Sequence, residues 1–234
     1  MHVRVGIENN NEGRSIAWAL EHPGCFAYGQ DADEAQASMQ QTVKDYAAWV
    51  RQHGMSWMEA PSLDIDVEET FDAYFVPRNA ASAEGKDDMY MVESFFHFDE
   101  QPLTGKDIEH ALKLLAWSRE DLLNTIGGLS QEQLSRTYPG ERWSINGILK
   151  HIGGAEWWYQ ERIGAPFPAR EEELPGNAVA ALELVRAHFL SLLPKLEGVH
   201  QMVKHEGEVW SPRKVLRRAL WHERDHTGHI RKLL

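Results

Sequence analysis

The first hundred residues contain short stretches in which apolar and polar positions alternate. A period of two is typical of a β-strand that buries one face. A cluster of turn-forming residues at 9–13 separates the first two stretches, so we expect a hairpin there. The alternation predicts β-strands at residues 2–7, 14–20, 25–28, 63–71 and 90–98.

Between the third and fourth of these strands, the apolar spacing changes to that of a helix. Asp31 begins this segment, and the acidic residues of its first turn complement the helix dipole. Gly54 provides a C-terminal stop. Apolar residues recur at a helical period, at Ala35, Met39, Val43, Tyr46, Ala47 and Val50. The first part of the chain is therefore predicted to fold as a β-β-β-α-β domain.

The pattern becomes helical throughout after a break at residues 101–105, which itself follows a loop expected from the composition of residues 77–88. Capping residues mark the helix starts at Thr104, Ser144 and Ser211, and a proline follows the last of them. Helices are predicted at about 105–126, 144–163 and 177–193 and from 211 onward, with a short capped turn at 130–133. We therefore predict a two-domain α+β protein, with residues 1–100 as an α/β domain and residues 101–234 as an up-and-down four-helix bundle.

Charge is divided unevenly between the two predicted domains. Residues 1–100 carry 6 Lys/Arg and 19 Asp/Glu, a net charge of −13, whereas residues 101–234 carry 18 and 17. An acidic surface repels phosphate backbones, which argues against nucleic-acid binding by the first domain.

Composition also indicates where the protein works. The sequence has no run of about 18 apolar residues that could span a membrane, and its first residues lack the apolar core of a signal peptide. Cys25 is the single cysteine, so an intramolecular disulfide framework is excluded. We expect a cytoplasmic protein that does not associate with membranes.

Two histidines of the last predicted helix, His222 and His226, are four residues apart. They lie on the same helix face and can supply half of a divalent metal site. Together with Glu223, they also match H-E-x-x-H, the zinc-protease signature. That alternative lacks its usual downstream ligand, because Lys232 stands where a metzincin has its third histidine and the sequence ends eight residues after His226. A third ligand is expected upstream.

The best upstream candidate is His151. It lies in a predicted helix that opens with Trp143-Ser144 and continues to Glu156-Trp-Trp-Tyr159. This helix, followed by a final helix with H-x-x-x-H, resembles the DinB/YfiT-like four-helix bundles. The resemblance covers roughly residues 103–234.

The resemblance to DinB implies a metal site and a type of reaction. In that family three histidines bind one divalent metal inside the bundle, and the matching residues here are His151, His222 and His226. His229 stands where the family often has glutamine, and it is an alternative ligand. Three imidazoles suit zinc, nickel or iron and leave one position open. Several members resemble transferases that use a low-molecular-weight thiol, and others are regarded as metal hydrolases. We therefore expect a metal-dependent enzyme with a small-molecule substrate, in the first place a transferase in which the metal activates a low-molecular-weight thiol. Hydrolysis by a metal-bound water is the other option.

Two further residues are candidates for catalysis. Glu223 lies about 100° around the helix from the histidine pair, so it is either a general base turned toward the metal by the bundle or a surface residue. Tyr159 follows His151 on the same helix and could hydrogen-bond a substrate. Packing or surface pairing is the alternative for Tyr159, as it is for Glu156.

The first domain resembles a different family. The segments Ala17–Leu20, Pro23–Cys25 and Asp31–Ala35, with Gly29, are similar to the core of HicB-like antitoxins over roughly residues 3–75. The resemblance implies an α/β fold that could hold a partner protein or form a homodimer through a sheet edge. The alternative function is therefore a non-catalytic protein-binding or regulatory module of toxin–antitoxin ancestry, whose acidic domain binds a basic protein.

Overall fold

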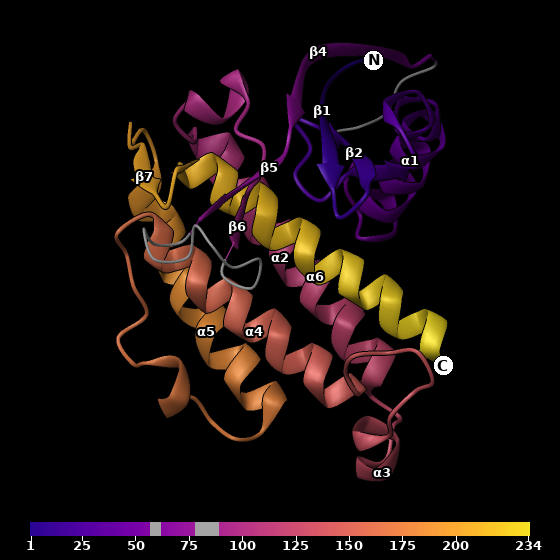
Figure 1. Cartoon of the computed structure of the whole chain (residues 1–234), viewed down its shortest axis with the longest axis vertical. Helices are drawn as coiled ribbons and strands as arrows, with labels where there is room; N and C mark the ends of the chain where they lie inside the picture. The colour runs from indigo at the N-terminus through magenta and orange to yellow at the C-terminus, as the bar shows by residue number, and fades with distance from the viewer. Residues whose placement is uncertain (57–61, 78–88) are drawn as a thin grey trace. The chain divides into compact units, whose positions relative to one another are not determined.

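The structure is a computed structural model that describes residues 1–56, 62–77 and 89–234. The chain forms two compact units. The sheet unit contains Met1–Glu100 and Lys204–Trp210, and the bundle unit contains Gln101–Val203 and Ser211–Leu234. The fold is therefore of mixed α+β type, with a sheet-rich N-terminal part and a helical C-terminal part (Figure 1).

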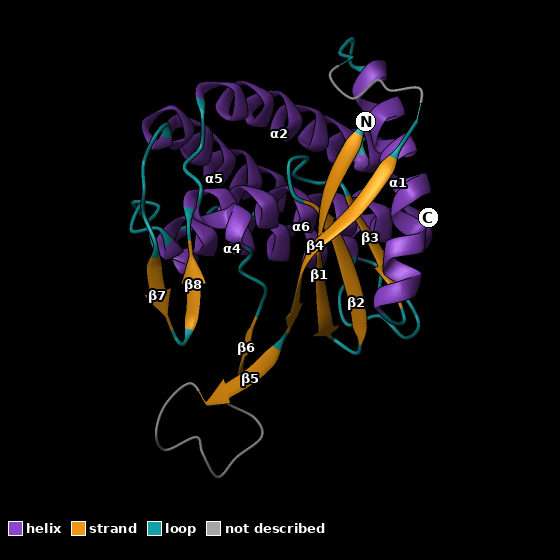
Figure 2. Ribbon diagram, turned by 90° about the horizontal axis from the view of Figure 1, so that it is seen from above, coloured by secondary structure: helices purple, strands orange, loops and turns teal. Residues whose placement is uncertain are grey.

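The sheet unit is built on four strands in the order β3-β2-β1-β4. These are β1 (His2–Asn11), β2 (Arg14–Ala19), β3 (Phe26–Gly29) and β4 (Asp64–Asp72). Strands β1 and β2 form the expected antiparallel hairpin, while β1 and β4 are parallel. Helix α1 (Ala32–Gln52) connects β3 to β4 and packs on the sheet (Figure 2). The predicted β-β-β-α-β order is confirmed.

Helix α1 begins and ends where its capping residues indicate. The Asp31 carboxylate accepts a hydrogen bond from the Glu34 amide, and the chain leaves the helix at Gly54, which has a φ of 78°. The six apolar residues predicted to face inward are all buried. Before the helix, a Cβ added at Gly29 would lie 2.2 Å from the amide nitrogen of Ala35. Glycine is therefore required for the close approach of β3 to the first turn of α1.

The strand predicted at residues 90–98 is much shorter than expected. Strand β6 covers only Met89–Val92 and pairs with β5 (Tyr74–Pro77). Residues His97–Glu100 form a 3-10 helix, because the Asp99 carboxylate accepts a hydrogen bond from the Phe96 amide and holds the turn. The loop predicted at 77–88 lies, apart from Pro77, outside the described residues.

A hairpin just before the last helix was not predicted. It consists of β7 (Val203–His205) and β8 (Glu208–Trp210), joined by Glu206 and Gly207, which both have positive φ values as a tight type I′ turn requires. The Tyr90 hydroxyl of β6 donates a hydrogen bond to the Glu208 carboxylate. Residues 204–210 consequently belong to the sheet unit, although the sequence pattern places them in the second domain.

The bundle unit contains four long helices whose bounds agree closely with the prediction. They are α2 (Gly105–Ile126), α4 (Ile145–Arg162), α5 (Ala178–Leu192) and α6 (Pro212–Leu233), with the short α3 (Gln131–Ser135) after α2. Helix α6 packs against α2 and α4, and α4 packs against α5 (Figure 1). The N-cap hydroxyls of Thr104, Ser144 and Ser211 each accept a hydrogen bond from a backbone amide three residues on.

Aliphatic side chains fill one part of the bundle core. Each fully buried Leu or Ile contributes about 1.5–3 kcal/mol through the hydrophobic effect. The cluster comprises Leu122, Ile126, Ile145, Ile148, Leu149, Ile152, Ala178, Leu182 and Ile230. None of the helices in the described part of the chain is long and apolar enough to cross a membrane.

Candidate metal centre

Three imidazole rings meet inside the bundle unit. His151 comes from α4, and His222 and His226 come from successive turns of α6. The Nε2 atom of His222 lies 3.0 Å from Nε2 of His151 and 3.2 Å from Nε2 of His226. The structure therefore brings together the three residues that the sequence singled out.

The spacing of these nitrogen atoms suits a single transition-metal ion. Two nitrogens bound to one tetrahedral zinc at about 2.0–2.1 Å are about 3.3 Å apart. The two Nε2–Nε2 distances in the cluster are close to that value, and all three ligand atoms lie within 4.8 Å of one another. All three potential ligand atoms are imidazole nitrogens, and zinc, nickel and iron can each be bound by such a set.

The surroundings keep the imidazoles in the neutral form that binds metals. Burial holds the pKa of His222 well below its ordinary value of 6.5, and the neighbouring His226, His151 and Arg218 lower it further. Burial, followed by the proximity of His151 and His229, lowers the pKa of His226 to about 4. Both rings are therefore neutral at physiological pH, and metal binding need not displace a proton from either of them.

Aromatic side chains hold the ligand rings in place. The Trp143 ring stacks on the His151 ring, with centroids 4.6 Å apart and an interplanar angle of 30°. The Tyr159 ring meets the His222 ring edge-on at 6.3 Å. Tyr159 is 5% exposed, so it packs beside the cluster rather than on the surface.

His229 lies outside the cluster, contrary to its candidacy as an alternative ligand. Its Nε2 atom is 2.9 Å from the Glu141 carboxylate, with which it forms an exposed pair. The His229 and His226 rings are 6.3 Å apart. His229 therefore contacts Glu141 near the end of α6, away from the three converging nitrogen atoms.

Glu223 is neither a surface residue nor turned toward the histidines. It is 1% exposed, and its carboxylate is paired with Arg119 at 2.8 Å and Arg186 at 3.1 Å. The surface role is therefore wrong, whereas the general-base role stays a prediction for a carboxylate that contacts two buried arginines. Glu156 likewise pairs with Arg186 in the interior. The signal available was Arg186, which lies among mostly apolar residues in the α5 segment, since a buried charge requires a partner.

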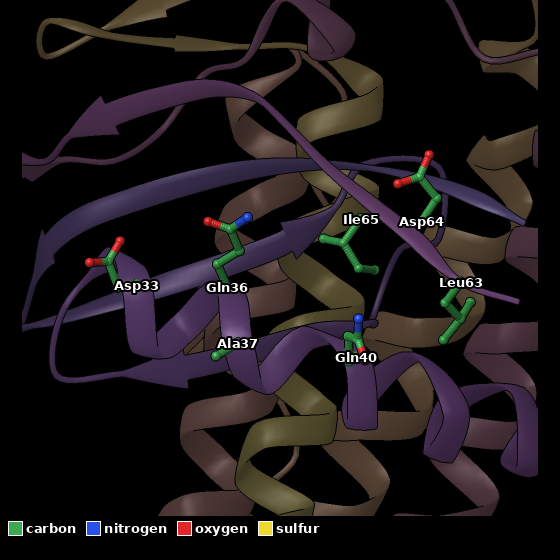
Figure 3. Close-up of a pocket in the computed structure, with 7 residues that line it drawn as sticks. All are labelled: Asp33, Gln36, Ala37, Gln40, Leu63, Asp64 and Ile65. Atoms are coloured by element: carbon green, nitrogen blue, oxygen red, sulfur yellow. The ribbon is translucent and has the colours of Figure 1, made fainter.

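A separate pocket of about 560 Å³ lies in the sheet unit, between α1 and the start of β4 (Figure 3). Its lining is polar and contains the carboxylates of Asp33 and Asp64 and the amides of Gln36 and Gln40. None of the described residues that line it is a histidine or a cysteine. The described lining of this pocket therefore offers no imidazole or thiol ligand.

The bundle unit is thus a helical bundle in which three imidazoles converge. Residues 114–230, half of the chain, match the DinB superfamily, and the chain belongs to this superfamily. The match leaves the N-terminal residues outside it, so the similarity of the first domain to HicB stays a prediction.

Two individual proteins are similar to part of this chain. A protein of Oceanobacillus iheyensis named "Putative metal-dependent hydrolase OB0413" is 28% identical over 152 residues, which cover 56% of this chain and 87% of that protein. A solved structure, "Crystal structure of TT2238, a four-helix bundle protein", aligns with a TM-score of 0.43 and 23% identity over 53% of this chain and 98% of that chain.

Proposed function

We propose that His151, His222 and His226 hold one divalent transition metal, such as zinc, nickel or iron, and that the protein is a metal-dependent enzyme acting on a small molecule. The observation that carries the proposal is the convergence of three imidazole rings from two helices, with His222 buried and His151 and His226 partly buried. Three imidazoles at this spacing would supply three ligands of an open, four-coordinate metal site.

A divalent ion held by three imidazoles supplies a Lewis acid that lowers the pKa of a bound water to about 7 or deprotonates a thiol. The residues of the chain then have distinct tasks. The three histidines bind the ion, and Trp143 fixes the plane of the His151 ring by stacking. Tyr159 packs beside His222 and excludes water from that side of the cluster.

Hydrolysis by an activated water is the reaction that we favour. The name of the Oceanobacillus relative supports it, since it describes a metal-dependent hydrolase. Transfer of a low-molecular-weight thiol to an electrophile is the second candidate. It is supported by the three-histidine ligand set, which accepts a thiolate as readily as a water, and by the resemblance to thiol-using members of the family.

The metal content of variant proteins tests the proposal. We expect about one divalent ion per chain in protein purified without metal columns, and its loss in His151→Ala and in His222→Ala. His229→Ala is the matched control, because His229 lies on the same helix outside the cluster and should leave the metal content unchanged. Metal retained in both ligand variants would refute the site.

Activity assays then separate the two reactions. Loaded protein and His151→Ala should be compared on simple esters and amides, and on a thiol with an electrophile. Hydrolysis that needs His151 and no thiol supports the favoured reaction. Product formation that needs both His151 and the thiol supports the second candidate.

A further inference from the structure

Four charged side chains are buried together in the bundle unit, and each comes from a different long helix. They are Arg119 of α2, Glu156 of α4, Arg186 of α5 and Glu223 of α6. None is more than 8% exposed. Taking four ionised groups out of water is costly, so their placement requires an explanation.

The four groups form a closed ring of ion pairs. Arg119 contacts Glu223 at 2.8 Å and Glu156 at 3.6 Å, while Arg186 contacts Glu156 at 2.7 Å and Glu223 at 3.1 Å. Each arginine thus touches both carboxylates, and each carboxylate touches both arginines. The ring is neutral overall, which removes the largest part of the cost of burying its members.

Both arginines also bind the backbone of the opposite helix. The Arg119 guanidinium on α2 donates to the carbonyl of Leu182 on α5 at 2.9 Å. The Arg186 guanidinium on α5 donates to the carbonyl of Leu115 on α2 at 2.7 Å. These two hydrogen bonds fix the positions of the guanidinium groups along the axes of α2 and α5. The carboxylates are therefore paired with arginines that are themselves held in place.

The distribution of the charges matches that of the histidines. The two carboxylates lie on α4 and α6, which carry the histidine cluster, and the two arginines lie on α2 and α5, which carry none of it. Glu223 is next to His222 and therefore points about 100° away from it around α6. Glu156 lies five residues after His151, about 140° around α4. Holding the two carboxylates consequently sets the rotation of both histidine-bearing helices.

Stability alone does not account for such a ring. Apolar side chains of similar volume often stabilise a core as well as buried ion pairs do, whereas ion pairs accept only a narrow set of geometries. The ring therefore restricts how α4 and α6 can be arranged.

We propose that Arg119, Glu156, Arg186 and Glu223 are positioning residues for the metal site, which hold α4 and α6 in the arrangement where His151 meets His222 and His226. The inference rests on the proposed function, since it concerns the affinity of that site for a metal. On this proposal, the ring holds the three imidazoles together before the ion binds.

The test uses a double variant that removes one pair and keeps the rest neutral. Arg119→Met with Glu223→Leu breaks the connection of α6 to the ring and leaves the Glu156–Arg186 pair intact. In the full chain, stripped of metal and titrated with zinc against a chelator, we expect an affinity about 10-fold or more below that of the parent, as found for groups that orient metal ligands. The visible spectrum of the cobalt-loaded protein should change as well.

Two companion variants keep the test decisive. Leu122→Ala opens a cavity on α2 without touching the charges, so it lowers stability but should leave the zinc affinity and the cobalt spectrum close to those of the parent. Arg119→Lys keeps the charge and loses the planar fork, and it stands in if the double variant does not fold. For Arg119→Lys we expect a weakening of several-fold, in the same direction.

The outcomes separate this inference from the proposed function. Suppose that the folded double variant, or Arg119→Lys in its place, binds zinc as tightly as the parent, while His151→Ala binds none. The ring is then not a positioning device, and the proposed metal site is unaffected. If Leu122→Ala weakens zinc binding as much as the double variant does, lost stability explains the effect and the inference is overturned. If the parent and His151→Ala bind zinc alike, the proposed site itself fails, and the inference fails with it.

Discussion

The sheet unit and the bundle unit place their charges in opposite surroundings. In β4, every second residue from Asp64 to Asp72 is exposed, and four of these five positions are acidic. In the bundle, two arginines and two glutamates are buried and paired with one another. The exposed carboxylates of β4 thus contribute to the net charge of −13 of residues 1–100, whereas the four buried charges of the bundle neutralise one another.

This difference shows what a charged residue contributes in each setting. Water and dissolved salt screen an exposed carboxylate, so an ion pair that it forms with a neighbouring side chain contributes only about 0–1 kcal/mol to the free energy of unfolding. A buried one depends on its partner, because an unpaired charge in the interior is strongly unfavourable. The acidic strand can therefore change with little effect on folding, and the ring cannot.

Removing one charge from the ring should have the largest effect on stability. Glu156→Gln leaves Arg186 and Arg119 with excess buried positive charge, and we expect the bundle to lose about 3–5 kcal/mol. The measurement is the free energy of opening from hydrogen exchange in peptides of α4 and α5. A loss below about 1 kcal/mol would mean that the ring is open to water.

The matched control for that experiment is Asp66→Asn on β4. Asp66 is exposed, and its histidine neighbour His2 is 3.9 Å away. The same removal of one negative charge should change the stability of the sheet unit by less than about 0.5 kcal/mol. A similar loss in both variants would contradict the comparison between the two units.

The sheet unit should instead be sensitive to backbone packing. Gly29→Ala would place a methyl group against the backbone of Ala35, so either β3 or the first turn of α1 must move. We expect the sheet unit to lose about 1–3 kcal/mol, read from hydrogen exchange in β2 and α1. Peptides of α4 and α6 should exchange as in the parent, and equal loss in both units would contradict their separate cores.

A partly buried carboxylate should show an intermediate, pH-dependent effect. Partial burial raises the pKa of Asp107, but hydrogen bonds from Arg213 and Thr104 outweigh it and hold the pKa below the ordinary value of 3.8. Because the folded pKa is depressed, the stabilisation is complete above the unfolded pKa and is lost as pH falls through the folded one. Asp107→Asn should therefore cost about 1 kcal/mol at neutral pH and progressively less as the pH falls below the depressed folded pKa. A cost that does not change with pH would exclude the charge as its origin.

The helices of the bundle could be predicted because their ends are marked locally. Thr104, Ser144 and Ser211 are N-caps in the structure. Residues 164–176 contain three prolines, so this segment could not continue a helix. His222 and His226 could be paired from their spacing alone. Their meeting with His151 required the resemblance to DinB, since no local pattern connects two helices 71 residues apart.

Two of the errors depend on residues that are distant in the sequence, and one depends on a local contact. Glu223 was expected at the surface or at the metal, and its arginine partners lie on other helices. The strand predicted to reach Phe98 ends at Val92, because the Asp99 carboxylate binds back to the backbone. Residues 204–210 lack a long alternating pattern, and their attachment to the sheet unit depends on a hydrogen bond between Tyr90 and Glu208.

The central claim is that three histidines from two helices form one metal site, and elemental analysis tests it most directly. Protein purified without metal columns should be compared with the double variant His151→Ala/His222→Ala, after confirming that both are folded. We predict about one transition-metal ion per chain in the parent and none in the variant. Equal metal content in the two proteins, or no metal in the parent even after reconstitution with zinc, nickel or iron, would contradict the account.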